Sequence, residues 1–211
     1  MLIKPGCSGT FPEAGCDEAG RGCLAGPVAA AAVIMPEGWS HPLLNDSKKL
    51  SKKHREELRI IIEASALHWA VNFVDAAEID RINILQASIT GMHRALAQLK
   101  TEPEIILVDG NRFRPYKNIT FRTEIKGDGR FVSIAAASIL AKTHRDEYME
   151  QLHLEFPQYG WDLNAGYPTA KHRDAIRQFG PSPYHRLSFQ LLPRQLELFS
   201  DAVRKQTGTK K

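Results

Sequence analysis

The sequence from Gly15 to Ile34 is GCDEAGRGCLAGPVAAAAVI, and it predicts two strands joined by a glycine-rich turn. The second strand is the apolar run from Val28 to Ile34, which Pro36 ends. The first strand ends in two adjacent acidic residues, Asp17 and Glu18, which strand propensity does not explain. Acidic residues where a core strand meets a turn are typical of a functional site.

The rest of the chain alternates strand patterns with helix patterns. The apolar run over 104–110 predicts a central strand buried on both faces, with Asp109 at its end. We expect further strands over 68–74 and 119–125, and helices over 51–66, 83–100, 131–156, 169–180 and 191–205. The predicted fold class is therefore α/β, a mixed sheet flanked by helices with a helical C-terminal lobe.

Composition favours one globular domain over residues 1–211. The chain has 211 residues, of which 43% are hydrophobic and 25% charged, so it can bury a core and is not globally disordered. No apolar run approaches the ~18 residues of a membrane helix, and the N-terminus lacks a secretory signal, so we expect a cytoplasmic chain without membrane contact. The three cysteines form no C-x-x-C pair and are expected to be buried hydrophobes.

Charge is distributed unevenly along the chain. Residues 165–211 contain nine basic and three acidic residues, whereas the whole chain carries +4, so the preceding residues sum to −2. This distribution favours a protein that binds a polyanion with its C-terminal part and a cation with its body. A solvated helical surface with a flexible basic tail over 206–211 explains the charge equally well.

The acidic residues predict a metal site if their strands are neighbours. In one sheet, Asp17 and Asp109 would converge with Asp128, which lies in a Lys-Gly-Asp-Gly turn and by itself is also typical of an ordinary turn residue. Clustered carboxylates repel one another unless a cation is present, and oxygen ligands without His or Cys suit Mg²⁺ or Mn²⁺. Asp17 and Glu18 can share such a site only if the strand ends or bulges there.

Nine short motifs are spread along the chain. They are DEAGRG at 17–22, LAGPV at 24–28, NDSKKLS at 45–51, VDGN at 108–111, KGD at 126–128, AAASILAK at 135–142, FPQYG at 156–160, GYPT at 166–169 and HRLSF at 185–189. In this order they resemble bacterial ribonuclease HII, and the resemblance covers about residues 14–190. The related ribonuclease HIII has an extra N-terminal domain, and the sixteen residues before Asp17 disfavour that form.

The resemblance implies a ribonuclease H-like fold and a divalent-metal-dependent endoribonuclease. Such an enzyme hydrolyses RNA within RNA–DNA hybrids. It also cuts on the 5′ side of single ribonucleotides embedded in duplex DNA, leaving a 5′-phosphate and a 3′-OH. The implied cofactor is Mn²⁺ or Mg²⁺, and the implied partner is nucleic acid. We expect a monomer, and the sequence identifies no replication or repair protein as a partner.

The resemblance also assigns roles to individual residues. Asp17, Glu18, Asp109 and Asp128 are implied to be the catalytic, metal-binding acids. Gly20, Arg21 and Gly22 form the turn that recognises the RNA–DNA junction, and Tyr167 packs against the deoxyribose that follows the ribonucleotide. Further contacts to substrate phosphates are expected from Lys48, Lys49, His185, Arg186 and Ser188.

Two departures from the family pattern leave this set intact. Cys16 stands where an aliphatic residue is usual, and Cys23 where proline is common. Neither removes a ligand, although Cys23 alters the rigidity expected of the turn. We expect His172 and the other remaining histidines on the surface.

Other interpretations remain open from the sequence. The glycine-rich turn can serve only to reverse the chain, and a lone tyrosine such as Tyr167 is often a core residue. A second class of function is a protein that binds nucleic acid without cleaving it. The four acids argue against this class, because converging negative charges near a phosphate do not help binding. A glycosidase using Asp17 or Glu18 with Asp109 is a third class, and it leaves the basic C-terminal part unexplained.

Overall fold

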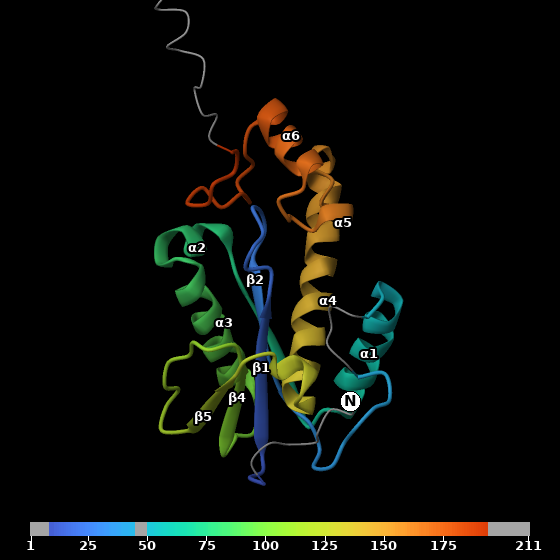
Figure 1. The fold of residues 1–211 in the computed structure, drawn as a ribbon, viewed down its shortest axis with the longest axis vertical. Coiled ribbons are helices and arrows are strands. Elements are labelled where there is room, and N and C mark those ends of the chain that lie inside the picture. Colours follow the sequence, from blue (N-terminus) through green and yellow to red (C-terminus); the bar gives the residue numbers. More distant parts are fainter. Residues whose placement is uncertain (1–8, 45–49, 194–211) are drawn as a thin grey trace, which may run out of the picture.

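The computed structural model describes residues 9–44 and 50–193, which form a five-stranded mixed sheet covered by helices on both faces (Figure 1). The strand order is β3-β2-β1-β4-β5. The central strand β1 runs antiparallel to β2 and parallel to β4. The strands are β1 (Glu13–Ala19), β2 (Val28–Ile34), β3 (His68–Val74), β4 (Ile105–Asp109) and β5 (Thr120–Glu124). Every predicted strand is confirmed.

The helices follow the predicted pattern with two additions. They are α1 (Lys52–Ser65), α2 (Ala76–Ile82), α3 (Ile84–Gln98), α4 (Val132–Glu155), α5 (Trp161–Asn164) and α6 (Ala170–Phe179), with 3-10 turns η2 (Gly127–Gly129) and η3 (Pro157–Tyr159). The prediction missed α2 and α5, which are too short to show a hydrophobic period. In the predicted last helix, residues 191–193 are not helical, and 194–205 lie outside the described residues.

Side chains at the helix starts explain why these helices begin where they do. Ser51 Oγ accepts a hydrogen bond from the His54 N–H of α1, and Thr169 Oγ1 accepts one from the His172 N–H of α6, each at 3.2 Å. The predicted helices begin at these two positions. These bonds satisfy N–H groups that have no partner within the first turn of a helix.

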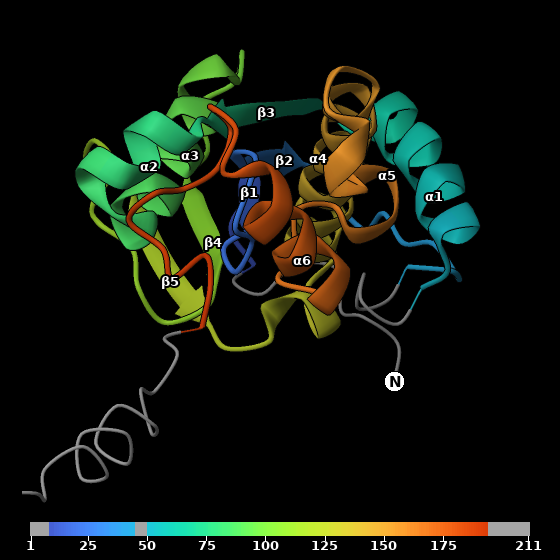
Figure 2. The same ribbon diagram turned by 90° about the horizontal axis from the view of Figure 1, so that it is seen from above.

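The sheet is the middle layer of three (Figure 2). Alternate residues of β2 serve the two faces: Ala30 and Ala32 pack in the cluster with α3, whereas Ala31 and Val33 pack in the cluster with α1 and α4. A strand buried on both faces is apolar throughout, which explains the uninterrupted run of β2.

Helix α4 lies very close to β1 at Gly15. A Cβ atom at this position would lie 2.0 Å from the carbonyl carbon of Ser133, so only glycine fits. Small residues in α4, Ala135 to Ala137, extend the close approach. Asp17 follows two residues later on the same face of β1 and is therefore placed against α4.

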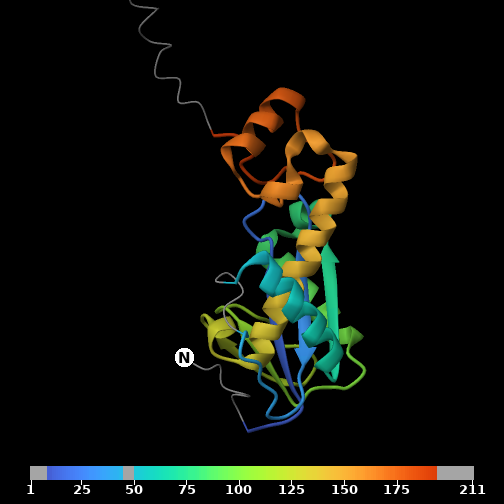
Figure 3. The same cartoon turned by 90° about the vertical axis from the view of Figure 1, so that its right-hand side faces the viewer.

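The helical C-terminal lobe sits at the end of the sheet where β1 ends (Figure 3). Leu24 and Ala25, from the segment after β1, pack with Trp161 of α5 and Ile176 of α6. The glycine-rich turn thus lies between the end of β1 and the segment that packs on the lobe. In the described part of the chain, no helix has the length and apolar character required to cross a bilayer.

Candidate active site

Asp17 and Asp109 lie at the same edge of the sheet. β1 and β4 pair in parallel register up to Cys16 opposite Val108, and the next residue in each strand is acidic. Both acids fall on the face covered by α4, because Gly15 on β1 contacts α4 and Leu107 on β4 packs with Ile134 of α4. The prediction that these strands are neighbours is confirmed.

Asp17 is buried in an unfavourable electrostatic environment. Burial raises its pKa well above the ordinary value of 3.8, and the charges of Glu18 and Asp109 raise it further. Hydrogen bonds from the Ser138 side chain and from the Glu18 N–H, the latter 2.7 Å from Asp17 Oδ1, oppose this shift. The fold therefore concentrates negative charge here, as a cation-binding site requires.

Asp109 is connected to the turn that carries Asp128. Its Oδ1 accepts a hydrogen bond of 2.7 Å from the Gly127 N–H, and Asp128 is buried in η2. A Cβ atom at Gly127 would lie 2.6 Å from Ile134 Cδ1 of α4, so η2 packs closely against this helix. The bond orients the Asp109 carboxylate and keeps η2 beside β4.

Glu18 leaves the strand on the face opposite to Asp17. The β1–β2 ladder stays regular through Ala19, so the bulge that would turn both acids to one side is absent from it. The Glu18 carboxylate instead forms an ion pair with Arg21, with 3.1 Å between Oε1 and Nη1. The two acids interact electrostatically without sharing one face.

The acids do not form a closed metal cage. In residues 9–44 and 50–193, no three His, Cys, Asp or Glu side chains are grouped so that they could hold an ion. The chemistry of the donors nevertheless fits a hard divalent cation, since all four candidates are carboxylates. Such a cation would relieve the repulsion of Asp17 by Glu18 and Asp109, which raises the pKa of Asp17.

The turn after β1 presents Arg21 and Gly22 to solvent, while Gly20 is buried beneath them. Gly20 has φ +93°, and a Cβ atom there would lie 1.9 Å from Nε of Arg145. Glycine is required at this position by its backbone conformation and by the contact with Arg145. The turn is therefore held in one position against α4.

Tyr167 lies beside this turn and is not a core residue, because 39% of it is exposed. Lys142 Nζ and Arg145 Cζ lie 5.7 and 5.9 Å from the centre of its ring. Burial of its hydroxyl end raises the pKa of Tyr167, and the neighbouring Cys23 thiol raises it further. The ring is thus supported by the protein and still accessible.

Two residues expected at the phosphates are buried instead. Arg186 is fully buried, with Nε donating to the Gly26 carbonyl and Nη1 to the Arg21 carbonyl, each at 3.0 Å. His185 is also buried, and its Nδ1 accepts from the Ser182 N–H at 2.9 Å. Direct phosphate contact by either side chain was a wrong prediction. The side chains of Arg186 and His185 instead form hydrogen bonds with the backbone of the loops around the turn.

The remaining expected contacts have different placements. Ser188 is exposed, and its Oγ donates to Asp80 Oδ1 of α2 at 2.5 Å. Asp80 also accepts from the Leu187 N–H, so it fixes this loop to α2. Lys48 and Lys49 lie outside the described residues.

His172 was expected at the surface and is fully buried. Its Nδ1 lies 2.9 Å from the Tyr167 carbonyl oxygen, which can only accept, so Nδ1 carries the proton. Its Nε2 then accepts from Trp161 Nε1 at 3.0 Å and from His185 Nε2 at 3.2 Å. Both histidines are therefore neutral and connect the Tyr167 loop to the rest of the lobe.

Sequence reasoning also missed exposed cations next to the acids. Arg112 follows Asp109 by three residues, and Lys126 precedes Asp128 by two. Both are exposed, and neither forms an ion pair with another residue of the described ranges. Their closeness in sequence to Asp109 and Asp128 could have identified them as candidates for substrate binding.

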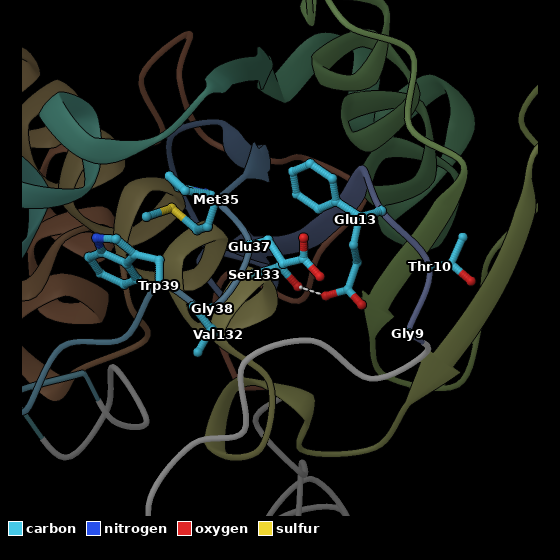
Figure 4. Close-up of a pocket in the computed structure, with 11 residues that line it drawn as sticks. Gly9, Thr10, Glu13, Met35, Glu37, Gly38, Trp39, Val132 and Ser133 are labelled. Atoms are coloured by element: carbon cyan, nitrogen blue, oxygen red, sulfur yellow. Dashed lines mark hydrogen bonds between the residues drawn. The ribbon is translucent and has the colours of Figure 1, made fainter.

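A cavity at the other end of β1 does not belong to this site (Figure 4). It is lined by Glu13, Met35, Trp39 and Ser133, among others. The Ser133 hydroxyl donates to Glu13 Oε1 at 2.7 Å across it. This bond stabilises the buried carboxylate within the protein.

Comparison with known proteins gives a consistent picture. The family model described as Ribonuclease HII matches residues 14–192. The chain is 59% identical over 200 residues to the ribonuclease HII of Bacteroides fragilis, covering 94% of this chain and 100% of that protein.

Solved structures show the same similarity. Ribonuclease H2 from Pyrococcus horikoshii OT3 has a TM-score of 0.73 at 27% identity, covering 85% of this chain and 94% of that one. A chain in the PCNA:RNase HII complex from Archaeoglobus fulgidus has the same TM-score and identity, covering 89% and 99%. These matches confirm the predicted fold class.

The buried histidines predict a specific loss of stability in acid. Burial, followed by the charge of His172, lowers the pKa of His185 from 6.5 to about 4. An unfolded chain binds this proton near pH 6.5, so the contribution of His185 is complete above that pH and is lost as the pH falls towards 4. We expect this residue to account for up to roughly 3 kcal/mol of the loss.

Urea denaturation of wild type and His185→Gln between pH 7.5 and 4 measures this effect. The variant should be less stable at pH 7.5 and should lose less stability on acidification. His54→Gln, at an exposed position in α1, is the control and should follow wild type. Equal pH dependence in wild type and His185→Gln would contradict a neutral buried His185.

Proposed function

The chain belongs to the ribonuclease HII family, and from this premise we propose that its reaction takes place at the carboxylates beside the C-terminal ends of β1 and β4. It is a metal-dependent hydrolase that cleaves RNA in RNA–DNA hybrids and at ribonucleotides embedded in DNA. The observation that carries the proposed site is the parallel register of β1 and β4, which makes Asp17 and Asp109 the next residues of adjacent strands. The proposed catalytic and metal-binding acids are Asp17, Glu18, Asp109 and Asp128.

We propose Mn²⁺ or Mg²⁺ as the ion that these acids hold. When bound, it supplies the charge that activates the attacking water and stabilises the leaving oxygen of the phosphodiester. Asp17 and Asp109 project from adjacent strands on the same face of the sheet. Ser138 and the Gly127 N–H hold these two carboxylates in place. Glu18 must exchange its ion pair with Arg21 to take part.

Recognition of the substrate is assigned to the turn and to Tyr167. The backbone of the exposed Arg21-Gly22 segment can approach a ribose 2′-OH closely, since Gly22 has no side chain to prevent it. The exposed part of the Tyr167 ring offers an apolar surface for a deoxyribose. A ribose there would place a hydroxyl against a surface that cannot bond it.

Phosphate contacts are proposed for five residues. Lys48, Lys49 and Ser188 keep their proposed roles, and we add Arg112 and Lys126 because both are exposed and without an ion pair in the described ranges. His185 and Arg186 support the turn from within the protein. We further propose that the chain acts as a monomer in the cytoplasm.

Cleavage of a duplex that contains one ribonucleotide tests the proposed function. With Mn²⁺ or Mg²⁺, we expect a cut on the 5′ side of the ribonucleotide that leaves a 5′-phosphate and a 3′-OH, since water is the nucleophile. Asp109→Asn should lower the rate by roughly 10³-fold or more. Asp174→Asn, at an exposed position in α6, should keep the wild-type rate.

The products distinguish the mechanisms. A cyclic 2′,3′-phosphate would show attack by the ribose itself and would refute a water nucleophile. Undiminished cleavage in the presence of a chelator would refute the metal-dependent reaction.

Removal of charge from the acid cluster should stabilise the protein without metal. In chelator, we expect Asp17→Asn to melt higher than wild type by roughly 2–4 °C, because the variant cannot be repelled by Glu18 and Asp109. Millimolar Mn²⁺ should raise the melting temperature of wild type by mass action and leave Asp17→Asn nearly unchanged. Differential scanning fluorimetry with Asp174→Asn as control measures both effects. An equal response of Asp17→Asn and wild type to Mn²⁺ would remove Asp17 from the ligands.

The salt dependence of substrate binding tests the added cations. Each phosphate contact contributes about 0.9 to the slope of log Kd against log salt concentration. Arg112→Ala and Lys126→Ala should each reduce the slope by about that amount. Lys117→Ala is the matched control, because this exposed lysine is paired with Glu102 at 3.0 Å. Equal slopes for wild type and the two test variants would exclude Arg112 and Lys126 as phosphate contacts.

A further inference from the structure

Arg145 is a fully buried arginine in α4 that donates hydrogen bonds to three backbone carbonyls. Its Nε donates to Pro27 and its Nη2 to Ala25, at 2.8 and 3.1 Å, and both carbonyls follow the glycine-rich turn. Its Nη1 donates to Ala165 at 2.8 Å, two residues before Tyr167. One side chain thus connects the two segments that are proposed to recognise the substrate.

The turn segment and the Tyr167 loop pack closely against Arg145 and against each other. The Arg145 side chain passes so close to Gly20 that a Cβ atom there would lie 1.9 Å from Nε. Above it, the Leu24 N–H donates to the Gly166 carbonyl at 2.8 Å, and a Cβ atom at Gly166 would lie 2.4 Å from the Ala25 carbonyl oxygen. Little room remains for the turn and the Tyr167 loop to shift relative to each other.

The same guanidinium lies under the aromatic ring. Its Cζ is 5.9 Å from the centre of the Tyr167 ring, within the range of a cation–π interaction. Arg145 therefore contacts the backbone on both sides and also supports the side chain that faces solvent. Arg145 is thus the side chain that contacts both the turn segment and the Tyr167 ring, beside the backbone hydrogen bond from Leu24 to Gly166.

Burial of this charge is hard to explain by stability alone. In residues 9–44 and 50–193, Arg145 forms no ion pair with an acidic residue, and all its hydrogen bonds go to neutral carbonyls. A buried charge without an opposite charge is unfavourable, and well-packed apolar residues are often at least as stable. Only arginine, with its planar fork of donors, reaches three carbonyls at once, and lysine does not.

We infer that Arg145 is a positioning residue that sets the distance between the Arg21-Gly22 turn and the Tyr167 ring, and thereby the preference of the enzyme for a ribonucleotide followed by a deoxyribonucleotide. This inference rests on the proposed function. Under this inference, a change at Arg145 alters the ratio of kcat/KM between the two kinds of substrate more than it alters hydrolysis of a continuous hybrid. A continuous RNA–DNA hybrid, where a ribose follows the cleaved position, should depend less on this distance.

The test compares kcat/KM on two substrates, a duplex with one embedded ribonucleotide and a continuous hybrid, for Arg145→Lys. Lysine keeps the positive charge and loses the fork that holds both segments. We expect a loss of roughly 10- to 100-fold on the single ribonucleotide, the size of effect that a small misplacement produces, and a much smaller loss on the hybrid. Arg94→Lys, at a surface ion pair with Glu78, is the control and should leave both values unchanged.

A double-mutant cycle separates positioning from general packing. If Arg145 acts by placing Tyr167, then adding Arg145→Lys to Tyr167→Ala should produce little further loss of preference. Equal losses on both substrates, or full additivity of the two substitutions, would overturn the inference. If Arg145→Lys does not fold, Gly166→Ala decides the question, because its Cβ atom would push the Tyr167 loop away from Ala25. It should reduce the same preference, and an unchanged preference would overturn the inference.

The same assay shows separately whether the proposed function holds. Wild type should prefer the single ribonucleotide, and Tyr167→Ala should reduce that preference. If wild type shows no preference and Tyr167→Ala changes nothing, the proposed recognition fails together with this inference. If both behave as proposed while Arg145→Lys keeps the wild-type ratio, only the inference fails.

Discussion

Parallel pairing of β1 with β4 is the constraint on which the rest of the site depends. The register that places Cys16 opposite Val108 makes Asp17 and Asp109 the next residues of adjacent strands. The close approach of α4 at Gly15 then buries Asp17 against Ser138. Repulsion between these carboxylates opposes folding, and the sheet and α4 together hold them in place. A divalent cation gains affinity from the same arrangement because it removes the repulsion.

The recognition elements are built on the continuation of the same strand. After Glu18 the chain enters the turn at Gly20, passes over Arg145 and is held to the lobe by Arg186. Two buried guanidinium groups bonded to carbonyls add to the apolar packing of Leu24 and Ala25 that fixes this segment. Their hydrogen bonds are directional, so they can specify the path of the backbone where apolar contacts would allow it to slide. Catalytic acids and recognition turn are thus separated by a single residue, Ala19.

The sequence was informative wherever a pattern repeats over several residues. β2 and α3 were predicted from apolar runs and periodicity, and Asp17 and Asp109 from their positions at strand ends. Burial of individual polar residues was harder to predict, because Arg145 and Arg186 look like surface residues in any propensity scale. Helical periodicity nevertheless held a signal for two of these residues that the prediction did not use. His172 precedes the buried Ala175 and Ile176 of α6 by three and four residues. Arg145 lies four residues from both Ala141 and Met149, which are buried on α4.

The central claim is that the carboxylates at the ends of β1 and β4 form the metal centre. An anomalous difference map from crystals grown with Mn²⁺ tests it most directly. The account predicts manganese density in contact with carboxylate oxygens of both Asp17 and Asp109. Manganese bound only elsewhere on the chain, with neither of these two residues among its ligands, would contradict it.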